Sequence, residues 1–193
     1  MKGNSFQPGE KSRYLAALVV HAVIYKGESL RQWANNHNQP SLTPQTKKFF
    51  NSYLLGSLRW FIQNKIILTD LLNSPIKNKD KIVEVLLCSA IYEITRMRTP
   101  DYAVVASTVE AAKIAQKGHL KSLVNAVLRN FIRAKGKFIT KARQSPEGHY
   151  SFPSWFIKQT KKDYPNDWQS VLDASNQIPT LWLCINTSKI SLV

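Results

Sequence analysis

The sequence predicts an all-α protein. In successive segments, apolar side chains return at steps of three and four residues, the spacing that places them on one face of a helix. At Thr43-Pro44 and Thr99-Pro100, a residue that can cap a helix precedes proline, an arrangement typical of a helix start. The seven glycines lie at least six residues apart, so the sequence contains neither a GxGxxG turn nor a phosphate-binding P-loop. We therefore expect helices over most of the chain and no nucleotide-binding α/β fold.

The first half of the chain is expected to form a short tail and four helices. Residues 1–11 are largely polar and contain Pro8-Gly9, which indicates a flexible tail. The apolar spacing then predicts helices at 12–26, 30–37, 44–72 and 80–94. The third of these should break near Asn64 and end before Pro75, because the residue before a proline disfavours helical geometry.

The second half is expected to contain four more helices, at 101–117, 120–132, 155–164 and 167–175. The segment 120–132 is the clearest of them, since its seven apolar residues follow the i, i+3, i+4, i+7 spacing without a gap. Gly136 weakens the end of that helix. The residues Pro146, Gly148 and Pro153 then indicate a looser connection.

Only residues 181–186 alternate apolar and polar side chains in the way that predicts a β-strand. A single strand has no partner for its backbone hydrogen bonds, so this segment indicates the start of a further domain. We therefore expect three regions: a flexible tail at 1–11, a helical domain at 12–145, and linker helices with the beginning of another domain at 146–193.

The charge balance indicates an anionic partner. The chain of 193 residues contains 27 Lys and Arg against 12 Asp and Glu, a formal net charge of +15. It lacks an apolar run of the ~18 residues that a membrane span needs, and its start lacks the apolar run of a signal peptide. We expect a cytoplasmic protein that binds nucleic acid, with no membrane contact.

The candidate RNA-binding residues lie in one basic run. Between residues 111 and 143 there are nine Lys and Arg and no acidic residue. Within this run, four polar residues spaced four apart share one helix face: Lys121, Asn125, Arg129 and Arg133. Like charges at this spacing repel, and a polyanion would relieve the repulsion, although a solvated helix face is the structural alternative. The predicted RNA-binding residues are Lys113, Lys117, Lys121, Asn125, Arg129, Arg133, Lys135 and Lys137.

Other residue types give little indication of chemistry. The candidates for stacking on RNA bases are Tyr14, Trp60, Phe138, Tyr150 and Trp155, although large aromatics at helical spacing are more often core residues. Cys88 lies in an apolar run and is predicted to be a core residue, and Cys184 is 96 residues away with no CxxC spacing. The four histidines are scattered. We therefore expect no catalytic residue and no metal site.

Several motifs together resemble a known family. They are Gly56-Ser57-Leu58-Arg59, residues 90–94 (Ala-Ile-Tyr-Glu-Ile), Pro100 with the segments 103–105 and 109–113, and above all residues 120–129 (Leu-Lys-Ser-Leu-Val-Asn-Ala-Val-Leu-Arg). These segments are similar to the NusB antitermination factor and to the N-terminal domain of the RsmB (Sun/Fmu) ribosomal RNA cytosine methyltransferases.

The C-terminal part resembles the methyltransferases more closely than NusB. Residues 151–155 are similar to their Ser-x-Pro-x-Trp helix, and residues 176–186 to their Asn-x-x-Pro-x-x-Leu-Arg-Val-Asn strand. Cys184 stands where that family usually has arginine. The similarity covers about residues 12 to 187.

The resemblance implies a NusB-like helical bundle followed by short helices and one orphan terminal strand. In that family, the bundle helps to dock small-subunit ribosomal RNA for a separate catalytic domain, which transfers a methyl group from S-adenosylmethionine to C5 of a cytidine. The glycine-rich cofactor motif and the two catalytic cysteines of the family would lie beyond residue 193, and neither Cys88 nor Cys184 matches them. We therefore expect a truncated chain that binds no cofactor and does not methylate RNA on its own.

Three functions remain open at this point. The chain is an RNA-docking portion of an RsmB-like methyltransferase, a NusB-like transcription antitermination factor, or a remnant without function. The region after Pro153 favours the first over the second, because NusB does not need it. The orphan strand and the departure at Cys184 are the features that support a remnant.

Overall fold

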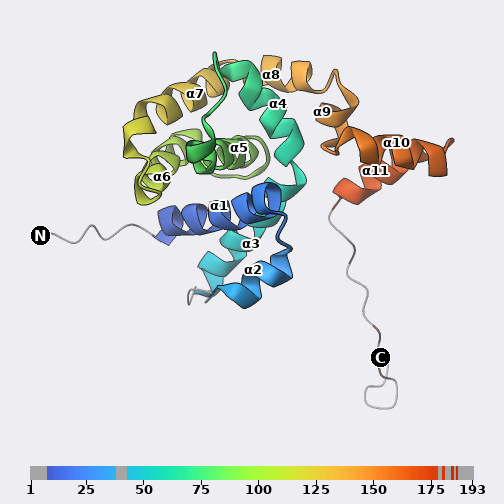
Figure 1. Ribbon diagram of the computed structural model, residues 1–193, viewed down its shortest axis with the longest axis horizontal. Coiled ribbons are helices and arrows are strands. Elements are labelled where there is room, and N and C mark those ends of the chain that lie inside the picture. Colours follow the sequence, from blue (N-terminus) through green and yellow to red (C-terminus); the bar gives the residue numbers. More distant parts are fainter. Residues whose placement is uncertain (1–7, 38–42, 178–179, 181–183, 185, 187–193) are drawn as a thin grey trace, which may run out of the picture.

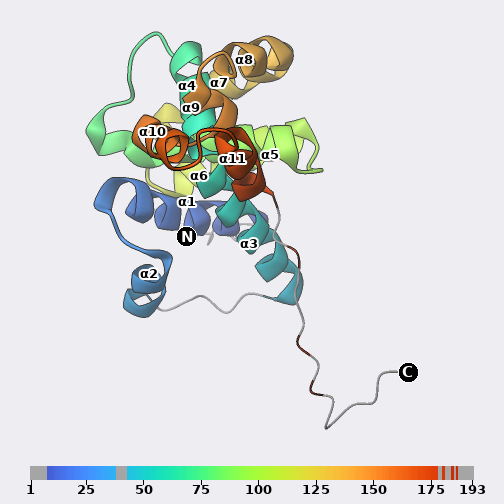
Figure 2. The same ribbon diagram turned by 90° about the vertical axis from the view of Figure 1, so that its right-hand side faces the viewer.

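The computed structural model describes residues 8–37, 43–177, 180, 184 and 186, and every regular element within them is a helix (Figures 1 and 2). The predicted all-α class is therefore confirmed for this part of the chain. Most of the strand predicted at 181–186 lies outside the described residues. The α-helices are α1 Pro8–Lys26, α2 Leu30–Asn36, α3 Pro44–Arg59, α4 Phe61–Leu71, α5 Lys81–Arg96, α6 Asp101–Ile114, α7 Lys121–Arg133, α8 Lys135–Ala142, α9 Pro146–Tyr150, α10 Ser154–Asp163 and α11 Trp168–Asn176, and two 3-10 turns are η1 Asn78–Asp80 and η2 Gly118–Leu120.

Local side-chain caps explain where three of the helices begin. Ser29 and Gln32 form a reciprocal capping box at the start of α2. The Thr43 hydroxyl accepts a hydrogen bond from the Thr46 backbone N–H at 3.3 Å, with proline next in the first turn of α3. The Ser145 hydroxyl does the same for the Gly148 N–H at 3.1 Å at the start of α9. These starts are therefore fixed by sequence-local interactions.

Helix α5 forms the centre of the bundle. Figure 1 looks nearly along its axis, with α1, α3, α4, α6 and α7 packed around it. Residues 83–91 are all buried, so this part of α5 has no solvent-facing side. The sequence pattern predicted an apolar stripe on one face only. The structure buries the other face as well, including two carboxylates, Glu84 and Glu93.

The Glu93 carboxylate is completely buried and is held by Arg13 of α1. Arg13 Nη2 lies 2.5 Å from Glu93 Oε1, and Arg13 Nε donates a hydrogen bond to Oε2 at 2.9 Å. The same guanidinium lies 4.8 Å from the centre of the Phe49 ring on α3. This two-point contact therefore joins α1, α3 and α5 inside the core.

A second buried carboxylate, Glu84, joins α1, α4 and α5. Its Oε2 lies 2.5 Å from Lys81 Nζ, and its Oε1 accepts a hydrogen bond from the Tyr25 hydroxyl and lies 3.4 Å from Lys65 Nζ. The hydrogen bonds from Lys81 and Tyr25 keep the pKa of Glu84 below its usual value, although burial acts in the opposite direction as the largest single influence. Glu84 is therefore charged in the core at neutral pH.

Two predicted boundaries are wrong. Helix α1 begins at Pro8, so residues 8–11 of the predicted tail are helical, and Arg13 Nη1 donates a hydrogen bond back to the Gly9 carbonyl in this first stretch. The predicted helix 44–72 is two helices that meet at Trp60 and not at Asn64. Asn64 lies inside α4, and its buried amide Nδ2 donates a hydrogen bond of 3.1 Å to the Cys88 carbonyl on α5. This bond offsets the cost of burying a polar side chain within the helix.

The looser connection predicted at residues 146–153 is partly helical, since Pro146–Tyr150 form α9. Gly136 lies within α8, and a Cβ atom at this position would meet nothing within 4 Å. Close packing explains why position 148 in α9 is a glycine, since a Cβ there would lie 1.9 Å from the Ala142 carbonyl oxygen. The chain leaves α9 through Ser151, whose φ of 57° is left-handed.

The last three helices form a small core of their own. It contains Tyr150, Ile157 and Leu172, with Phe152, Phe156 and Trp168 packed against it. Figure 2 shows α10 and α11 standing in front of the main bundle. Gln63 of α4 attaches this unit to the bundle, because its Nε2 donates a hydrogen bond to the Gly148 carbonyl at 2.6 Å and its backbone N–H bonds the Ser151 hydroxyl at 3.2 Å.

Replacing Arg13 by alanine is expected to lower the free energy of unfolding by about 3 to 5 kcal/mol, because Glu93 would remain buried without a counter-charge. Urea denaturation of the whole chain measures this loss. Lys11→Ala removes an exposed cation from the same helix and should change the free energy by no more than about 0.5 kcal/mol. Equal effects of the two substitutions would contradict a special role for the Arg13–Glu93 pair.

Replacing Gly56 by alanine is expected to destabilise the protein by about 1 to 3 kcal/mol, because an added Cβ would lie 1.9 Å from Tyr92 Cζ. Gly136→Ala is the matched control, since open space surrounds that position. Thermal unfolding should show a lower melting temperature for the first variant only. A Gly56→Ala protein as stable as the wild type would mean that the Tyr92 ring moves without cost.

Candidate nucleic-acid interface

Helix α7 presents a polar outer face between two grooves. Its inner face is buried through Val124, Val127, Leu128 and Phe131, as its apolar spacing predicted. On one side of α7 lies a groove shared with α6, and on the other a groove shared with η1 and the segment before it. The polar residues of α7 therefore fall on two flanks of one rigid helix.

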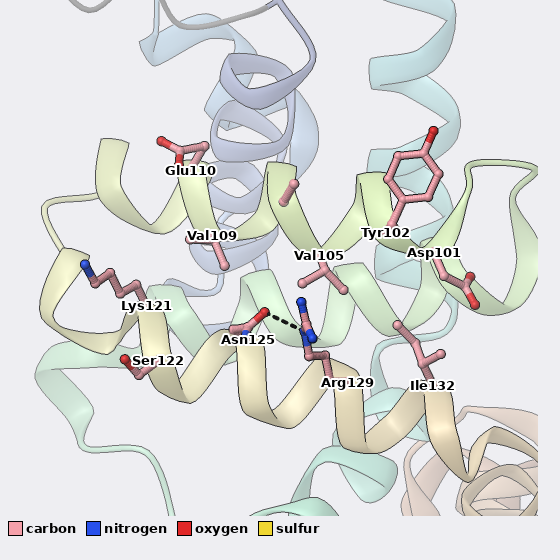
Figure 3. A pocket seen from close by; sticks show the side chains of 11 residues that line it. Asp101, Tyr102, Val105, Val109, Glu110, Lys121, Ser122, Asn125, Arg129 and Ile132 are labelled. Atoms are coloured by element: carbon pink, nitrogen blue, oxygen red, sulfur yellow. Dashed lines mark hydrogen bonds between the residues drawn. The ribbon is translucent and has the colours of Figure 1, made fainter.

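The α6–α7 groove has a volume of about 720 Å³ (Figure 3). Lys121, Asn125 and Arg129 rise from α7 along one wall, and Val105 and Val109 of α6 form apolar surface opposite them. Arg129 Nε donates a hydrogen bond to Asn125 Oδ1 at 3.1 Å, which fixes the guanidinium over the groove. The groove therefore presents N–H donors of fixed direction on α7 opposite an apolar surface on α6.

Acidic residues of α6 also line this groove. Figure 3 shows Asp101 and Glu110 on the α6 wall. Glu110 Oε1 lies 2.5 Å from Lys113 Nζ, so one charge of each sign is already paired there. Residues 111–143 contain no acidic residue, but in the folded protein Asp101 and Glu110 of α6 line the same groove as α7.

The η1–α7 groove is more basic. Its volume is about 780 Å³, and Arg133 of α7 faces a wall that includes Lys77 and Lys79. Its one acidic residue, Asp80, lies 2.8 Å from Lys117 Nζ. Lys77 and Lys79 were not among the predicted residues because they lie more than 30 positions before α7, although their spacing in Lys77-Asn78-Lys79 is a weak local signal.

The structure divides the eight predicted RNA-binding residues into two groups. Three have partners inside the protein: Lys113 pairs with Glu110, Lys117 pairs with Asp80, and Lys135 Nζ donates a hydrogen bond to the Ile94 carbonyl at 2.7 Å. Four others are exposed and form no ion pair with any described residue, namely Lys121, Arg129, Arg133 and Lys137. The eighth is Asn125, the hydrogen-bond partner of Arg129.

Arg133 lies on the other flank of α7 from Lys121. Each step of four residues turns a helix by about 40° beyond a full turn, so three steps carry the side chain about 120° around the axis. Arg133 Nη2 donates a hydrogen bond to Asn130 Oδ1 at 3.3 Å on this second flank. The predicted single row is therefore two surfaces, with Lys121, Asn125 and Arg129 on one and Arg133 on the other.

The Lys117–Asp80 pair fastens the end of η1 to the turn before α7. The Lys117 ammonium lowers the pKa of the Asp80 carboxyl group from its usual value, while burial opposes this shift. Both side chains are largely covered. Lys117 therefore stabilises the fold, and its contribution depends on an ionised Asp80.

The predicted aromatic candidates lie in different settings. Tyr14 and Phe138 pack against the main core, and Tyr150 belongs to the small C-terminal core. Trp155 is 68% exposed, and Tyr102 on the α6–α7 groove, which sequence reasoning did not select, is 79% exposed. An exposed aromatic can stack on an unpaired base, so Tyr102 and Trp155 are exposed enough to make that contact.

The described residues contain no cluster of three or more potential metal ligands and no helix that could cross a membrane. Cys88 is buried in the core, as predicted, and burial raises the pKa of its thiol. The described part of the chain is helical and has no strand–glycine turn–helix unit.

Comparisons with known proteins agree with the motifs. The model of the NusB family matches residues 10–133, and that of a methyltransferase RsmF/B-like, ferredoxin-like domain matches residues 152–192. The chain is 34% identical over 182 residues to the probable ribosomal RNA small subunit methyltransferase B of Coxiella burnetii, which covers 93% of the chain and 40% of that protein. The resemblance predicted from residues 120–129 and 151–155 is thereby confirmed.

Two other relatives give the same coverage. The chain is 32% identical over 174 residues to the ribosomal RNA small subunit methyltransferase B of Escherichia coli O6:H1 and to that of Yersinia enterocolitica. In both cases, the match covers 90% of this chain and 40% of the relative. The chain thus spans about 40% of the length of the curated relatives that it matches.

Replacing Lys117 by glutamine is expected to raise the pKa of Asp80 toward its usual value and to lower stability at neutral pH. A carboxyl group with a depressed pKa stabilises the fold above its unfolded pKa of about 4, and that stability is lost as the pH falls through the folded pKa. The stability difference from the wild type should therefore shrink as the pH drops below about 4. Urea denaturation at several pH values measures it, and a difference independent of pH would contradict the assignment.

Proposed function

Since the chain belongs to the NusB family, we propose that it is an RNA-docking module that binds small-subunit ribosomal RNA along the two flanks of α7. The observation that carries this proposal is a set of exposed cations on α7 and across from it that form no ion pair with a described residue: Lys121, Arg129, Arg133, Lys77 and Lys79. They are fixed on or beside one helix, and a phosphate backbone would neutralise them with release of its counterions.

The two flanks differ in the part of RNA that they suit. The η1–α7 groove has cations and one acid that Lys117 already neutralises, which suits backbone phosphates. The α6–α7 groove combines Arg129 and Asn125 with apolar surface and the exposed ring of Tyr102, which suits a base splayed out of a single strand. Lys113, Lys117 and Lys135 are engaged within the protein, so we assign them a supporting role in the interface.

In this proposed function, methyl transfer takes place on a separate domain and not on this chain. The relatives are named as methyltransferases, and the chain corresponds to about 40% of their length. The residues of this chain would orient the RNA, and a separate catalytic domain would bind S-adenosylmethionine and carry out the reaction. Such a module works in the cytoplasm, where bacterial ribosomal RNA is made and modified.

A NusB-like antitermination factor is the second candidate. The NusB match over residues 10–133 is common to both functions. The match of residues 152–192 to a methyltransferase-associated domain favours the first candidate. The RNA that the chain selects would separate the two functions.

The experiment that tests the proposal is binding of the purified chain to small-subunit ribosomal RNA fragments and to duplex DNA across a salt series. We expect preference for one RNA fragment that persists at physiological salt. Equal binding to every nucleic acid that disappears with salt would contradict a docking module and favour a remnant. Selective binding to a leader RNA upstream of the ribosomal sequence would instead support antitermination.

The double variant Arg129→Gln, Arg133→Gln is expected to bind the preferred RNA more weakly and to reduce the slope of log affinity against log salt by about 0.7 for each lost phosphate contact. Helicity should not change, because both side chains are exposed. The matched control is Arg31→Gln, Lys47→Gln, which removes the same charge from exposed positions of α2 and α3. Equal slopes for the two double variants would contradict the role of α7.

A further inference from the structure

A second group of cations lies away from the α7 flanks, around the junction of α3 and α4. Its members are Arg59 at the end of α3, Arg96 at the end of α5 and Arg143 after α8, and we call it the α3–α4 junction cluster. None of the three arginines takes part in an ion pair with a described residue. Two of the family-like motifs, 56–59 and 90–94, lie beside it.

Arg96 is held in one orientation. The centre of its guanidinium lies 3.3 Å from the centre of the Trp60 ring, so the two planar groups are in close contact. Arg96 Nη2 donates a hydrogen bond of 3.2 Å to Gln63 Oε1. Gln63 is itself buried and bonded to Gly148, so it cannot move freely. One face and one N–H of the guanidinium are thus fixed, and Arg96 remains partly exposed to solvent.

The electrostatic surroundings of Arg96 are unfavourable to its charge. Burial on the Trp60 side, together with the nearby charge of Arg143, lowers the pKa of Arg96 to about 10. Arg59 directly precedes Trp60, on which Arg96 stacks, and Arg143 directly follows Ala142, whose carbonyl lies against Gly148, the residue that Gln63 bonds. The carboxylate of the adjacent Glu93 is fully engaged by Arg13 on another side of α5. Glu93 is therefore engaged by Arg13 and does not pair with Arg96.

A purely structural explanation accounts for only part of this cluster. Arg96 lies in the last turn of α5, where a cation interacts favourably with the helix dipole, and Lys135 already bonds the Ile94 carbonyl there. Neither interaction involves Arg59 or Arg143. The charge of Arg143 disfavours the charge of Arg96, and an anion between the two guanidinium groups would relieve this repulsion.

We propose that the α3–α4 junction cluster binds a phosphate of the RNA backbone, with Arg96 as the oriented donor and Arg143 and Arg59 as the flanking cations. The proposal rests on the RNA-docking function proposed above and adds a second contact that is independent of α7. A guanidinium matches phosphate geometry with two parallel N–H groups, and stacking on Trp60 aims the unused donors of Arg96 before the ligand arrives. The net charge of +15 favours RNA over an acidic protein segment.

The site also places RNA next to the C-terminal helices. Gln63 contacts Arg96 through its side-chain oxygen and the α9 backbone through its side-chain nitrogen. RNA bound at the junction would therefore lie beside the unit formed by α9, α10 and α11. An RNA held at both α7 and this junction would extend across the bundle toward the C-terminal part of the chain.

The main test is the double variant Arg59→Gln, Arg143→Gln, measured as RNA affinity across a salt series with the full chain. This variant leaves the Arg96–Trp60–Gln63 contacts in place, so the fold should persist. We expect weaker binding to all RNA sequences that carry the docking site and a salt slope lower by about 0.7 per lost contact. The control Arg31→Gln, Lys47→Gln, with the same loss of charge, should keep a slope nearer to that of the wild type.

A second measurement follows the side-chain N–H signal of Arg96 by NMR while inorganic phosphate or a short single-stranded RNA is added. We expect both probes to shift this signal in the wild type and in Arg129→Gln, Arg133→Gln, and the shifts to be reduced in Arg143→Gln. Arg96→Lys keeps the charge but loses the planar fork, and it should weaken RNA binding without unfolding the chain.

The outcomes separate the two proposals. If the wild type binds RNA but the Arg59→Gln, Arg143→Gln variant has the affinity and salt slope of its control, the junction site is wrong and the docking function stands. A shift of the Arg96 signal by phosphate or by an acidic peptide, but not by RNA, would also overturn it. If the wild type binds no RNA, the docking function fails, and the junction site fails with it.

Discussion

The fold depends on the Arg13–Glu93 pair because it allows a carboxylate to lie inside the bundle. Helix α5 is enclosed by five other helices, and Glu93 has no access to solvent. A buried carboxylate without a partner is strongly unfavourable, so α1 must bring Arg13 to this point, and α3 must supply the aromatic surface of Phe49 beside it. The positions of α1 and α3 around α5 are therefore set by one charge as well as by apolar packing.

The same central helix connects the core to both candidate RNA contacts. One end of α5 carries Asp80 and η1, whose ion pair with Lys117 holds the wall of the η1–α7 groove. The other end carries Arg96, stacked on Trp60 at the α3–α4 junction. A rigid, fully packed helix thus spaces the two surfaces at a fixed distance. In the proposed complex, a constant spacing would let one extended polyanion bind both surfaces without a cost for rearranging the protein.

The C-terminal helices join this arrangement through α4. Gln63 is buried between the bundle and α9, and it uses its amide oxygen for Arg96 and its amide nitrogen for Gly148. The small core of Tyr150, Ile157 and Leu172 is separate from the main core, so this unit has few other constraints. A change at the junction would therefore reach α9 through Gln63, and this side chain would link the proposed RNA contact to the C-terminal unit.

The sequence by itself determined the helical class, the apolar face of α5, the buried face of α7 and the start of α3, because apolar periodicity and caps are local properties of the chain. It also identified the exposed cations Arg129 and Arg133. Which cations stay unpaired was decided only by the tertiary structure. Lys113, Lys117 and Lys135 look equivalent to Arg129 in the sequence, yet Glu110, Asp80 and the Ile94 carbonyl engage them. The break at Trp60 and the cluster of Arg59, Arg96 and Arg143 also arise from contacts between distant segments, which local patterns do not encode.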